Sequence, residues 1–143
     1  PRAVEYLNEG TGNILLTTGS KELSLYTGIQ DFTDRVYARV LPMASSLAAC
    51  QGAGLGPGHI IAMQGPFSRE LNTALLRFVQ ARYLVTKEDG GPGGFADKAA
   101  AAREAGATLV VIGRPPQREG LSLSDTAALL CRRFGLRGEL PEP

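Results

Sequence analysis

Short apolar runs recur along the chain at a nearly constant interval. They are NILLTT (13–18), VYARV (36–40), IIAM (60–63), YLVT (83–86) and TLVVI (108–112), and their first residues lie 23 to 25 residues apart. One strand, one helix and two loops fill such an interval. Near-continuous apolar strands that alternate with helices indicate a parallel sheet covered on both faces. The pattern therefore predicts a three-layer α/β fold with a five-stranded, mainly parallel sheet.

Helix signals occupy the intervals between the runs. Ser68 is a typical N-cap for a helix that runs to about Gln80. The apolar stripe expected on this helix is Leu71, Ala74, Leu75, Phe78 and Val79. Further helices are expected at 44–51, at 95–105 with Gly106 as the stop, and after a capping box at 122–125. The first crossover, residues 22–34, is expected to contain only one or two helical turns, around residues 23–26.

The length and the segment ends suggest one domain. A chain of 143 residues can form one domain with a sizeable core. Nothing before Asn13 forms a periodic element, so residues 1–12 are expected to be a linker or an incoming segment. Residues 13–136 are expected to form the domain and 137–143 a frayed tail. Because the chain begins with Pro1 and not with Met, we expect a fragment of a longer protein.

Composition and charge argue against several classes of protein. The chain is 43% apolar and 20% charged with a net charge of +1, so no global field attracts it to nucleic acid or to a membrane. No apolar run approaches the roughly 20 residues that span a bilayer, and no signal-peptide pattern is present. Cys50 and Cys131 fall in expected helices without ligand spacing. We therefore expect no metal site, two buried cysteines and a cytoplasmic protein.

The loop after the first run is rich in ligand-binding groups. Right-handed crossovers bring the loops that follow parallel strands to one sheet edge, where ligands bind in open α/β sheets. Gly19 allows close approach of the backbone, Thr18 and Ser20 offer hydroxyls, and Lys21 offers a mobile cation. The spacing of a Walker loop is absent. A capped strand-to-helix turn with a solvated lysine is the alternative.

The loop after the third run suits an anion. Gln64 opens it, Gly65 and Pro66 shape the turn, and Ser68 begins a helix. The free N–H groups of that helix start would face the ligand edge. A plain helix start is the alternative.

Other polar residues fall at or near the same edge. Thr86, Lys87 and Glu88 precede a glycine-rich loop at 90–94, which is either a ligand clamp or a plain surface loop. The G-x-G-x-x-A match at 91–96 is weak, because a proline interrupts it. Arg114 could bind a carboxylate or phosphate bidentately, or form an ordinary salt bridge.

Two further residues, one within a strand and one next to a strand, matter for the interpretation. Arg39, in the middle of VYARV, would be costly to bury without a partner. His59 precedes the third strand at the opposite sheet edge, so a catalytic role for it is not expected.

Taken together, the motifs resemble the C-terminal half of the precorrin-6A and cobalt-precorrin-6A reductase family. The matching blocks are ILLTTGSKEL (14–23), RVYARVLP (35–42), IIAMQGPFS (60–68) with Glu70 and Asn72, LVTKE (84–88), GGF (93–95) with Lys98, and VIGRP (111–115). The resemblance covers residues 13 to about 115. The unbroken TTGSKEL leans toward the cobalt-precorrin branch.

The resemblance implies a Rossmann-like, two-domain reductase of cobalamin biosynthesis. Such an enzyme transfers a hydride from NADPH or NADH to a tetrapyrrole that carries many carboxylate side chains. The N-terminal domain, absent here, would supply the other wall of the active site, so this half alone would be inactive.

The resemblance, with the sheet-edge argument, also implies the site residues. Those expected to bind cofactor or substrate are Thr18, Gly19, Ser20, Lys21, Arg39, Gln64, Gly65, Pro66, Ser68, Asn72, Thr86, Lys87, Gly94, Lys98 and Arg114. Lys87 and Glu88 are the nearest candidates for the proton donor, with water or a group of the absent half as alternatives. No internal partner is evident in the sequence for Lys21 or Lys87.

Two other classes share the βα rhythm. A response-regulator receiver needs a phosphate-accepting aspartate and an acidic pair after its strands, whereas here TTG (17–19) and MQG (63–65) stand at those places. That class is therefore not favoured. A non-catalytic ligand-binding or scaffold domain of the same fold stays open.

Overall fold

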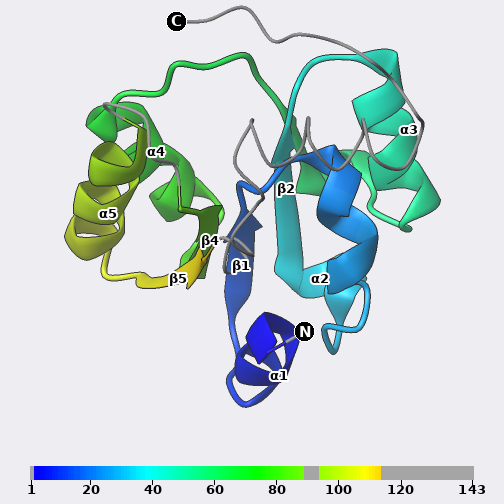
Figure 1. The fold of residues 1–143 in the computed structure, drawn as a ribbon, viewed down its shortest axis with the longest axis horizontal. Coiled ribbons are helices and arrows are strands. Elements are labelled where there is room, and N and C mark those ends of the chain that lie inside the picture. The colour runs from blue at the N-terminus through cyan, green and yellow to red at the C-terminus, as the bar shows by residue number, and fades with distance from the viewer. Residues whose placement is uncertain (1, 89–93, 114–143) are drawn as a thin grey trace, which may run out of the picture. The chain divides into compact units, whose positions relative to one another are not determined.

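The computed structural model describes residues 2–88 and 94–113 and contains the predicted parallel sheet (Figure 1). Its strands are β1 (Asn13–Leu16), β2 (Val36–Val40), β3 (Ile60–Ala62), β4 (Ala81–Lys87) and β5 (Thr108–Ile112). They lie in the order β3-β2-β1-β4-β5, and every neighbouring pair is parallel. The predicted α/β fold is confirmed.

The strand order creates a topological switch point between β1 and β4. From β1 the chain adds β2 and then β3 on one side, and it returns to place β4 on the other side. In open α/β sheets, ligands bind beyond the carboxyl ends of the strands at such a reversal. Thr17 and Glu88, the first residues after β1 and β4, flank this point.

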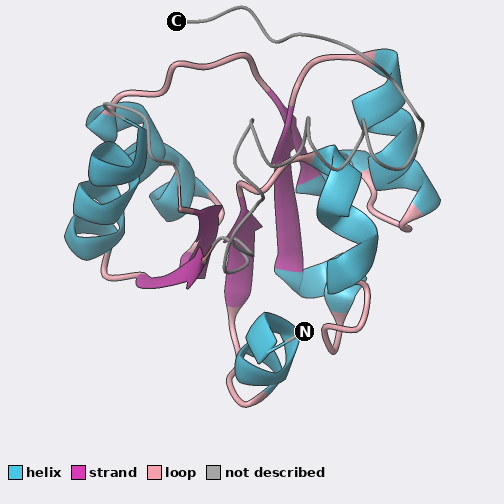
Figure 2. Cartoon of the chain, in the orientation of Figure 1, coloured by secondary structure: helices cyan, strands magenta, loops and turns pink. Residues whose placement is uncertain are grey.

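Helices cover both faces of the sheet (Figure 2). One face, with Ile14 and Val36, packs against the elements α1 (Arg2–Asn8), η1 (Ser20–Tyr26), α2 (Phe32–Arg35) and α3 (Ala44–Gly52). The other face, with Leu15 and Leu84, packs against α4 (Arg69–Phe78) and α5 (Gly94–Ala105). Alternation of side chains along each strand produces these two cores.

The expectation that no regular element precedes Asn13 is wrong, because α1 occupies that segment. Its residues Val4 and Leu7 are buried in the first core, and Leu7 is completely buried. Asn8 fixes the end of the helix, since its Nδ2 donates to the Gly28 carbonyl at 3.1 Å. Two buried apolar positions in seven residues are too few to establish a period. The role of residues 1–12 as a linker stays a prediction.

The apolar stripe predicted for α4 is correct only in part. Val79 is buried and Leu75 packs against the second core, but Phe78 is 80% exposed and Ala74 is also exposed. The buried residues within the helix are Asn72, Thr73 and Leu76. The polar residues among them are tolerated there because their side chains hydrogen-bond to main-chain carbonyls one turn earlier. Apolar periodicity could not reveal a buried face that is partly polar.

The remaining elements largely follow the expectations. The first crossover contains only η1 and α2, and Gly106 follows α5 with a φ of +71°. Before β3, the short helix η2 (Pro57–His59) holds His59 at the amino edge, where Nδ1 lies 2.9 Å from the Val36 carbonyl oxygen. Cys50 is buried, as expected, and burial raises its pKa.

Several expectations lie outside the described residues. These are the glycine-rich loop at 90–93, Arg114, the capping box at 122–125, Cys131 and the tail at 137–143. None of the helices that the structure describes has the length and apolarity to cross a bilayer.

We predict that α1 is part of the core. Leu7→Ala should lower the free energy of unfolding by about 2–5 kcal/mol, because it leaves a cavity at a completely buried position. Leu25, which is 54% exposed, is the matched control, and Leu25→Ala should change stability by about 0.5 kcal/mol or less. Denaturant unfolding of both variants measures the difference. Equal effects would contradict the assignment of α1 to the core.

Candidate functional site

A pocket of about 370 Å³ opens at the carboxyl edge of the sheet. Loops that follow β1, β2 and β3 line it, together with the first turns of α4 and α5. Its residues are Thr17, Gly19, Arg39, Val40, Leu41, Met63, Pro66, Phe67, Asn72, Gly94, Asp97 and Lys98. An apolar wall with a few placed polar groups, next to a topological switch point, is the usual form of a small-molecule site.

Arg39 is the most unusual residue of this pocket. It lies on the same face of β2 as Tyr37, toward α4, and it is only 6% exposed. Its Nη1 donates to the Asn72 Oδ1 at 2.7 Å, and its guanidinium carbon lies 3.8 Å from the centre of the Phe67 ring. Burial lowers its pKa to about 10, so the side chain stays positively charged at neutral pH. Among the described residues no carboxylate pairs with it.

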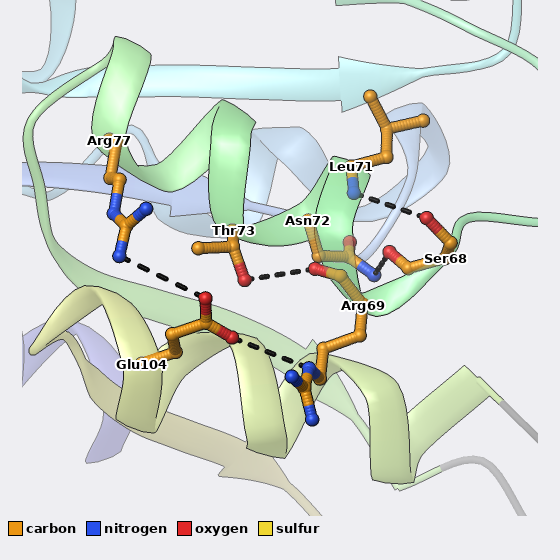
Figure 3. Close-up of polar contacts among 7 residues, drawn as sticks. All are labelled: Ser68, Arg69, Leu71, Asn72, Thr73, Arg77 and Glu104. Atoms are coloured by element: carbon orange, nitrogen blue, oxygen red, sulfur yellow. Dashed lines mark hydrogen bonds and ion pairs between the residues drawn. The ribbon is translucent and has the colours of Figure 1, made fainter.

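Asn72 is held in place by the loop that it faces. Its Nδ2 donates to the Ser68 carbonyl at 2.9 Å and, more weakly, to the Phe67 carbonyl at 3.4 Å. These two bonds leave Oδ1 as the atom that accepts from Arg39. Ser68 begins α4 as the sequence predicts, since its Oγ accepts from the Leu71 amide at 3.2 Å (Figure 3). The loop and the helix start therefore form one hydrogen-bonded unit beneath the guanidinium.

Gly65 leaves room for the ring that supports Arg39. A Cβ at Gly65 would lie 3.0 Å from the Phe67 ring, which is tighter than ordinary van der Waals contact. The glycine therefore acts on the pocket through Phe67, although it does not line the pocket itself.

Ion pairs hold α4 against α5. Glu104 on α5 lies between Arg69 and Arg77 of α4, at 3.3 Å from the Arg69 Nε and 3.9 Å from the Arg77 Nη2 (Figure 3). All three side chains are largely exposed, so each pair contributes about 1 kcal/mol at most. Their structural effect is to align two helices whose first turns both reach the pocket.

A second buried cation comes from α5. Lys98 is 9% exposed, and its Nζ donates to the Thr86 Oγ1 at 3.1 Å. Thr86, at the end of β4, is completely buried and does not line the pocket. Thr86 therefore orients Lys98, and Lys98 with its neighbour Asp97 forms the polar part of the α5 wall.

The two proposed proton donors lie elsewhere. The expectation that Lys87 has no internal partner is wrong, because its Nζ lies 2.8 Å from a carboxylate oxygen of Glu22. Glu22 follows the first strand, 65 residues earlier in the sequence, so the pairing was invisible to local pattern. Glu88 is exposed. Neither Lys87 nor Glu88 lines the pocket, and their role as proton donors stays a prediction.

The structure divides the predicted site residues into two groups. Those that line the pocket are Gly19, Arg39, Pro66, Asn72, Gly94 and Lys98. Those that lie outside its wall are Thr18, Ser20, Lys21, Gln64, Gly65, Ser68, Thr86 and Lys87. Arg114 lies outside the described residues. A binding role for any of them stays a prediction.

Thr18, Ser20 and Lys21 of the first loop do not line the pocket, and two of them have contacts elsewhere. The Ser20 hydroxyl donates to the Ser46 hydroxyl at 3.1 Å. Thr18 is buried beside Tyr26, whose pKa is raised mainly by burial while the Thr18 hydroxyl acts in the opposite direction. Lys21 is exposed and, within the described ranges 2–88 and 94–113, forms no ion pair.

Several pocket residues were missed from the sequence. They are Thr17, Val40, Leu41, Met63, Phe67 and Asp97. Thr17, Leu41 and Met63 each directly follow a strand, and this position was the available signal. The apolar pocket residues were not identified, because candidates were chosen for their polar or charged side chains.

Ser68→Ala should remove the cap of α4 and lower the free energy of unfolding by about 1 kcal/mol. Ser24 is an exposed serine whose hydroxyl makes no hydrogen bond within the described chain, so Ser24→Ala serves as the control. Thermal unfolding of both variants measures the difference. Loss of the same size in Ser24→Ala would argue against a specific capping effect.

The same substitution should also move the titration of Glu70. Its own backbone N–H, and next the Ser68 hydroxyl, hold the pKa of this carboxyl below its ordinary value. In Ser68→Ala the pKa should rise only part of the way, because the backbone bond remains. A lowered carboxyl pKa stabilises the fold above the ordinary pKa, and this stabilisation disappears as the pH falls through the lowered value. NMR titration of the Glu70 carboxyl carbon checks the shift, and an unchanged pKa would contradict the contact.

Comparison with known proteins identifies relatives of the chain. Residues 2–132 match the family described as Precorrin-6x reductase CbiJ/CobK. The chain is 42% identical over 115 residues to a cobalt-precorrin-6A reductase of Priestia megaterium, covering 79% of this chain and 45% of that protein. It is 38% identical over 123 residues to a cobalt-precorrin-6A reductase of Salmonella typhimurium, covering 85% and 46%. The chain thus spans less than half the length of these curated relatives.

A solved structure shares the fold. The protein described as CobK precorrin-6A reductase superposes with a TM-score of 0.61 at 24% identity, and the match covers 96% of this chain and 55% of that chain. At this level of identity the likeness concerns the fold alone.

Proposed function

The chain belongs to the precorrin-6x reductase family CbiJ/CobK, and we propose that it is the C-terminal half of a reductase of cobalamin biosynthesis. The proposed reaction reduces precorrin-6A or cobalt-precorrin-6A to its dihydro product. A hydride from NADPH or NADH is added to one carbon of a double bond, and a proton to its neighbour. The reaction is proposed for the whole protein, since this chain spans less than half the length of its relatives.

The observation that carries the proposal is a buried positive charge in a largely apolar pocket at the carboxyl edge of the sheet. Arg39 is buried and charged, and Leu41, Met63 and Phe67 stand around the same pocket. A tetrapyrrole with carboxylate arms combines an extended apolar ring with anionic groups at its rim. A pocket of this composition suits one rim of such a ligand.

The pocket is small for both ligands of the proposed reaction. Its volume of about 370 Å³ lies at the lower end of the roughly 300–1,000 Å³ of ordinary small-molecule sites. A macrocycle together with a dinucleotide needs more enclosed space. The proposal therefore includes a second wall from the remaining half of the protein.

Some pocket residues fit a nicotinamide cofactor. Gly19 adopts a φ of +87°, and a Cβ placed there would meet nothing within 4 Å, so the backbone can approach a ligand closely at this point. Gly94 and Lys98 lie on the opposite wall, in the first turns of α5. We propose that these residues hold part of the cofactor. The cofactor supplies the hydride, and the chain contributes orientation and charge compensation.

A second candidate function is favoured by the short span of the chain. With one wall of the site in these 143 residues, the chain alone would act as a ligand-binding domain without turnover. This reading shares the pocket with the first and differs only in the chemistry.

A chimeric enzyme tests the proposal. The segment of the Priestia megaterium reductase that aligns with this chain is replaced by this chain, and the protein is incubated anaerobically with cobalt-precorrin-6A and NADPH or NADH. We expect loss of absorbance at 340 nm and a product heavier by two mass units, because the transplanted half completes the site. The unaltered relative is the positive control, and this chain alone should bind without turnover.

A chimera that folds and binds both ligands but produces no reduced tetrapyrrole would favour the non-catalytic domain. A folded chimera that binds neither ligand would contradict both readings.

A further inference from the structure

Arg35 immediately precedes β2 and Arg39 lies within it, and the N–H groups of these two arginines differ in their hydrogen bonds. Arg35 donates from Nε, Nη1 and Nη2 to four main-chain carbonyls, those of Gly12, Gln30, Leu7 and Gly10. Arg39 donates from Nη1 alone, to Asn72. Within the part of the chain that the structure describes, Nε and Nη2 of Arg39 have no acceptor. A guanidinium carries five N–H donors, so most of the donors of Arg39 are unused by the described residues.

The unused edge of Arg39 is held in a fixed plane. The guanidinium stacks on the Phe67 ring at 3.8 Å, and the Asn72 amide that receives Nη1 is itself anchored by two main-chain carbonyls. Both contacts restrict rotation of the fork without neutralising its charge. Such a fork is prepared to bind two oxygen atoms that lie in its own plane.

The location of this edge points to a ligand. Arg39 lines the pocket, and although the residue is only 6% exposed, its unpaired Nε and Nη2 are not among the fully buried unpaired atoms of the described residues. These donors are therefore accessible from the pocket. A largely buried charge without a counter-charge is costly, and an anion bound in the pocket removes that cost.

A small negative charge on that anion is favoured by the described lining residues. Their charged side chains are Arg39, Lys98 and Asp97, and the Asp97 carboxylate repels a multiply charged group more than a singly charged one. A carboxylate carries one negative charge, whereas a phosphate monoester carries about −1.5 to −2 near pH 7. The planar carboxylate also matches the fork.

We infer that Arg39 recognises a carboxylate of the ligand bidentately, and that Phe67 and Leu41 contact the apolar body next to that carboxylate. Asn72 is the positioning residue that holds the guanidinium plane. The inference rests on the proposed function, since it names the group of the tetrapyrrole that this half binds.

Calorimetric titration of the chain tests the inference with two probes. One probe is uroporphyrin III, an octacarboxylate porphyrin, and the other is NADPH. Arg39→Lys keeps the charge and removes the fork, so uroporphyrin affinity should fall about tenfold or more while NADPH affinity stays unchanged. Arg82→Lys is the matched control, because Arg82 also lies over an aromatic ring, that of Tyr83 at 5.9 Å, but is exposed near the opposite end of β4.

A second measurement on the unaltered chain covers the case in which Arg39→Lys does not fold. With ¹⁵N-labelled arginine, the Nε–H signal of Arg39 should shift when uroporphyrin is added and should not shift with NADPH. In Asn72→Ala the uroporphyrin-induced shift of the Arg39 signal should become smaller, and by more than the loss of folded protein accounts for. A merely structural asparagine would change stability and leave the shift of the Arg39 signal intact.

The outcomes separate the inference from the proposed function. Unchanged uroporphyrin affinity in a folded Arg39→Lys, or an Arg39 signal that does not respond to uroporphyrin, overturns the inference alone. Loss of NADPH affinity instead assigns the residue to a phosphate and also overturns it. An unaltered chain that binds neither probe overturns both the inference and the proposed function.

Discussion

A buried guanidinium whose hydrogen-bond partner is a neutral amide determines the chemistry of this fold's ligand edge. The 2.7 Å bond from Arg39 to Asn72 joins β2 to the first turns of α4, and so fixes the loop between β3 and α4 against the sheet. Replacing the amide by a carboxylate would cancel the charge inside the protein. With the amide, the strand is joined to the helix and the charge remains available to a ligand. The apolar wall raises the strength of any such interaction, because it excludes water.

The two edges of the sheet differ in how their polar groups are used. At the amino edge, the Arg35 guanidinium binds main-chain carbonyls, and His59 lies against the carbonyl at the start of β2. These side chains therefore contact main-chain carbonyls at the ends of strands and in loops. At the carboxyl edge, Arg39 and Lys98 each face the pocket. The parallel arrangement produces this division, since every strand delivers its following loop to the same edge.

Much of the fold could be predicted from the sequence because buried parallel strands are almost continuously apolar. The bounds of β2 and β5 match their apolar runs, and the cap at Ser68 is where the sequence places it. The errors have a common cause. Helices that bury few residues, or that bury polar residues, show no regular apolar period in the sequence. Helix α1 offers only two buried apolar residues, and α4 buries Asn72 and Thr73 through hydrogen bonds.

The site was predictable only in part, for a related reason. A charged residue inside an apolar strand is visible as an anomaly, so Arg39 could be singled out from the sequence. The family resemblance also named Asn72, but its pairing with Arg39, 33 residues away, could not be predicted, and neither could the pairing of Lys87 with Glu22. Phe67 lies in a loop that the sequence singles out, but it was not selected as a binding residue. Its contribution is a flat apolar surface beneath a cation, which polar motifs do not reveal.

The central claim is that ligand binds at the carboxyl edge of the sheet, around the charge of Arg39. Two-dimensional amide NMR of the ¹⁵N-labelled chain, titrated with uroporphyrin III and separately with NADPH, tests this claim most directly. The account predicts that the amides of Gly19, Leu41, Phe67 and Gly94, around the pocket, shift most. Shifts concentrated at Gly12, Gly58 and Gly106, which precede strands at the opposite edge, or no shifts with either ligand, would contradict it.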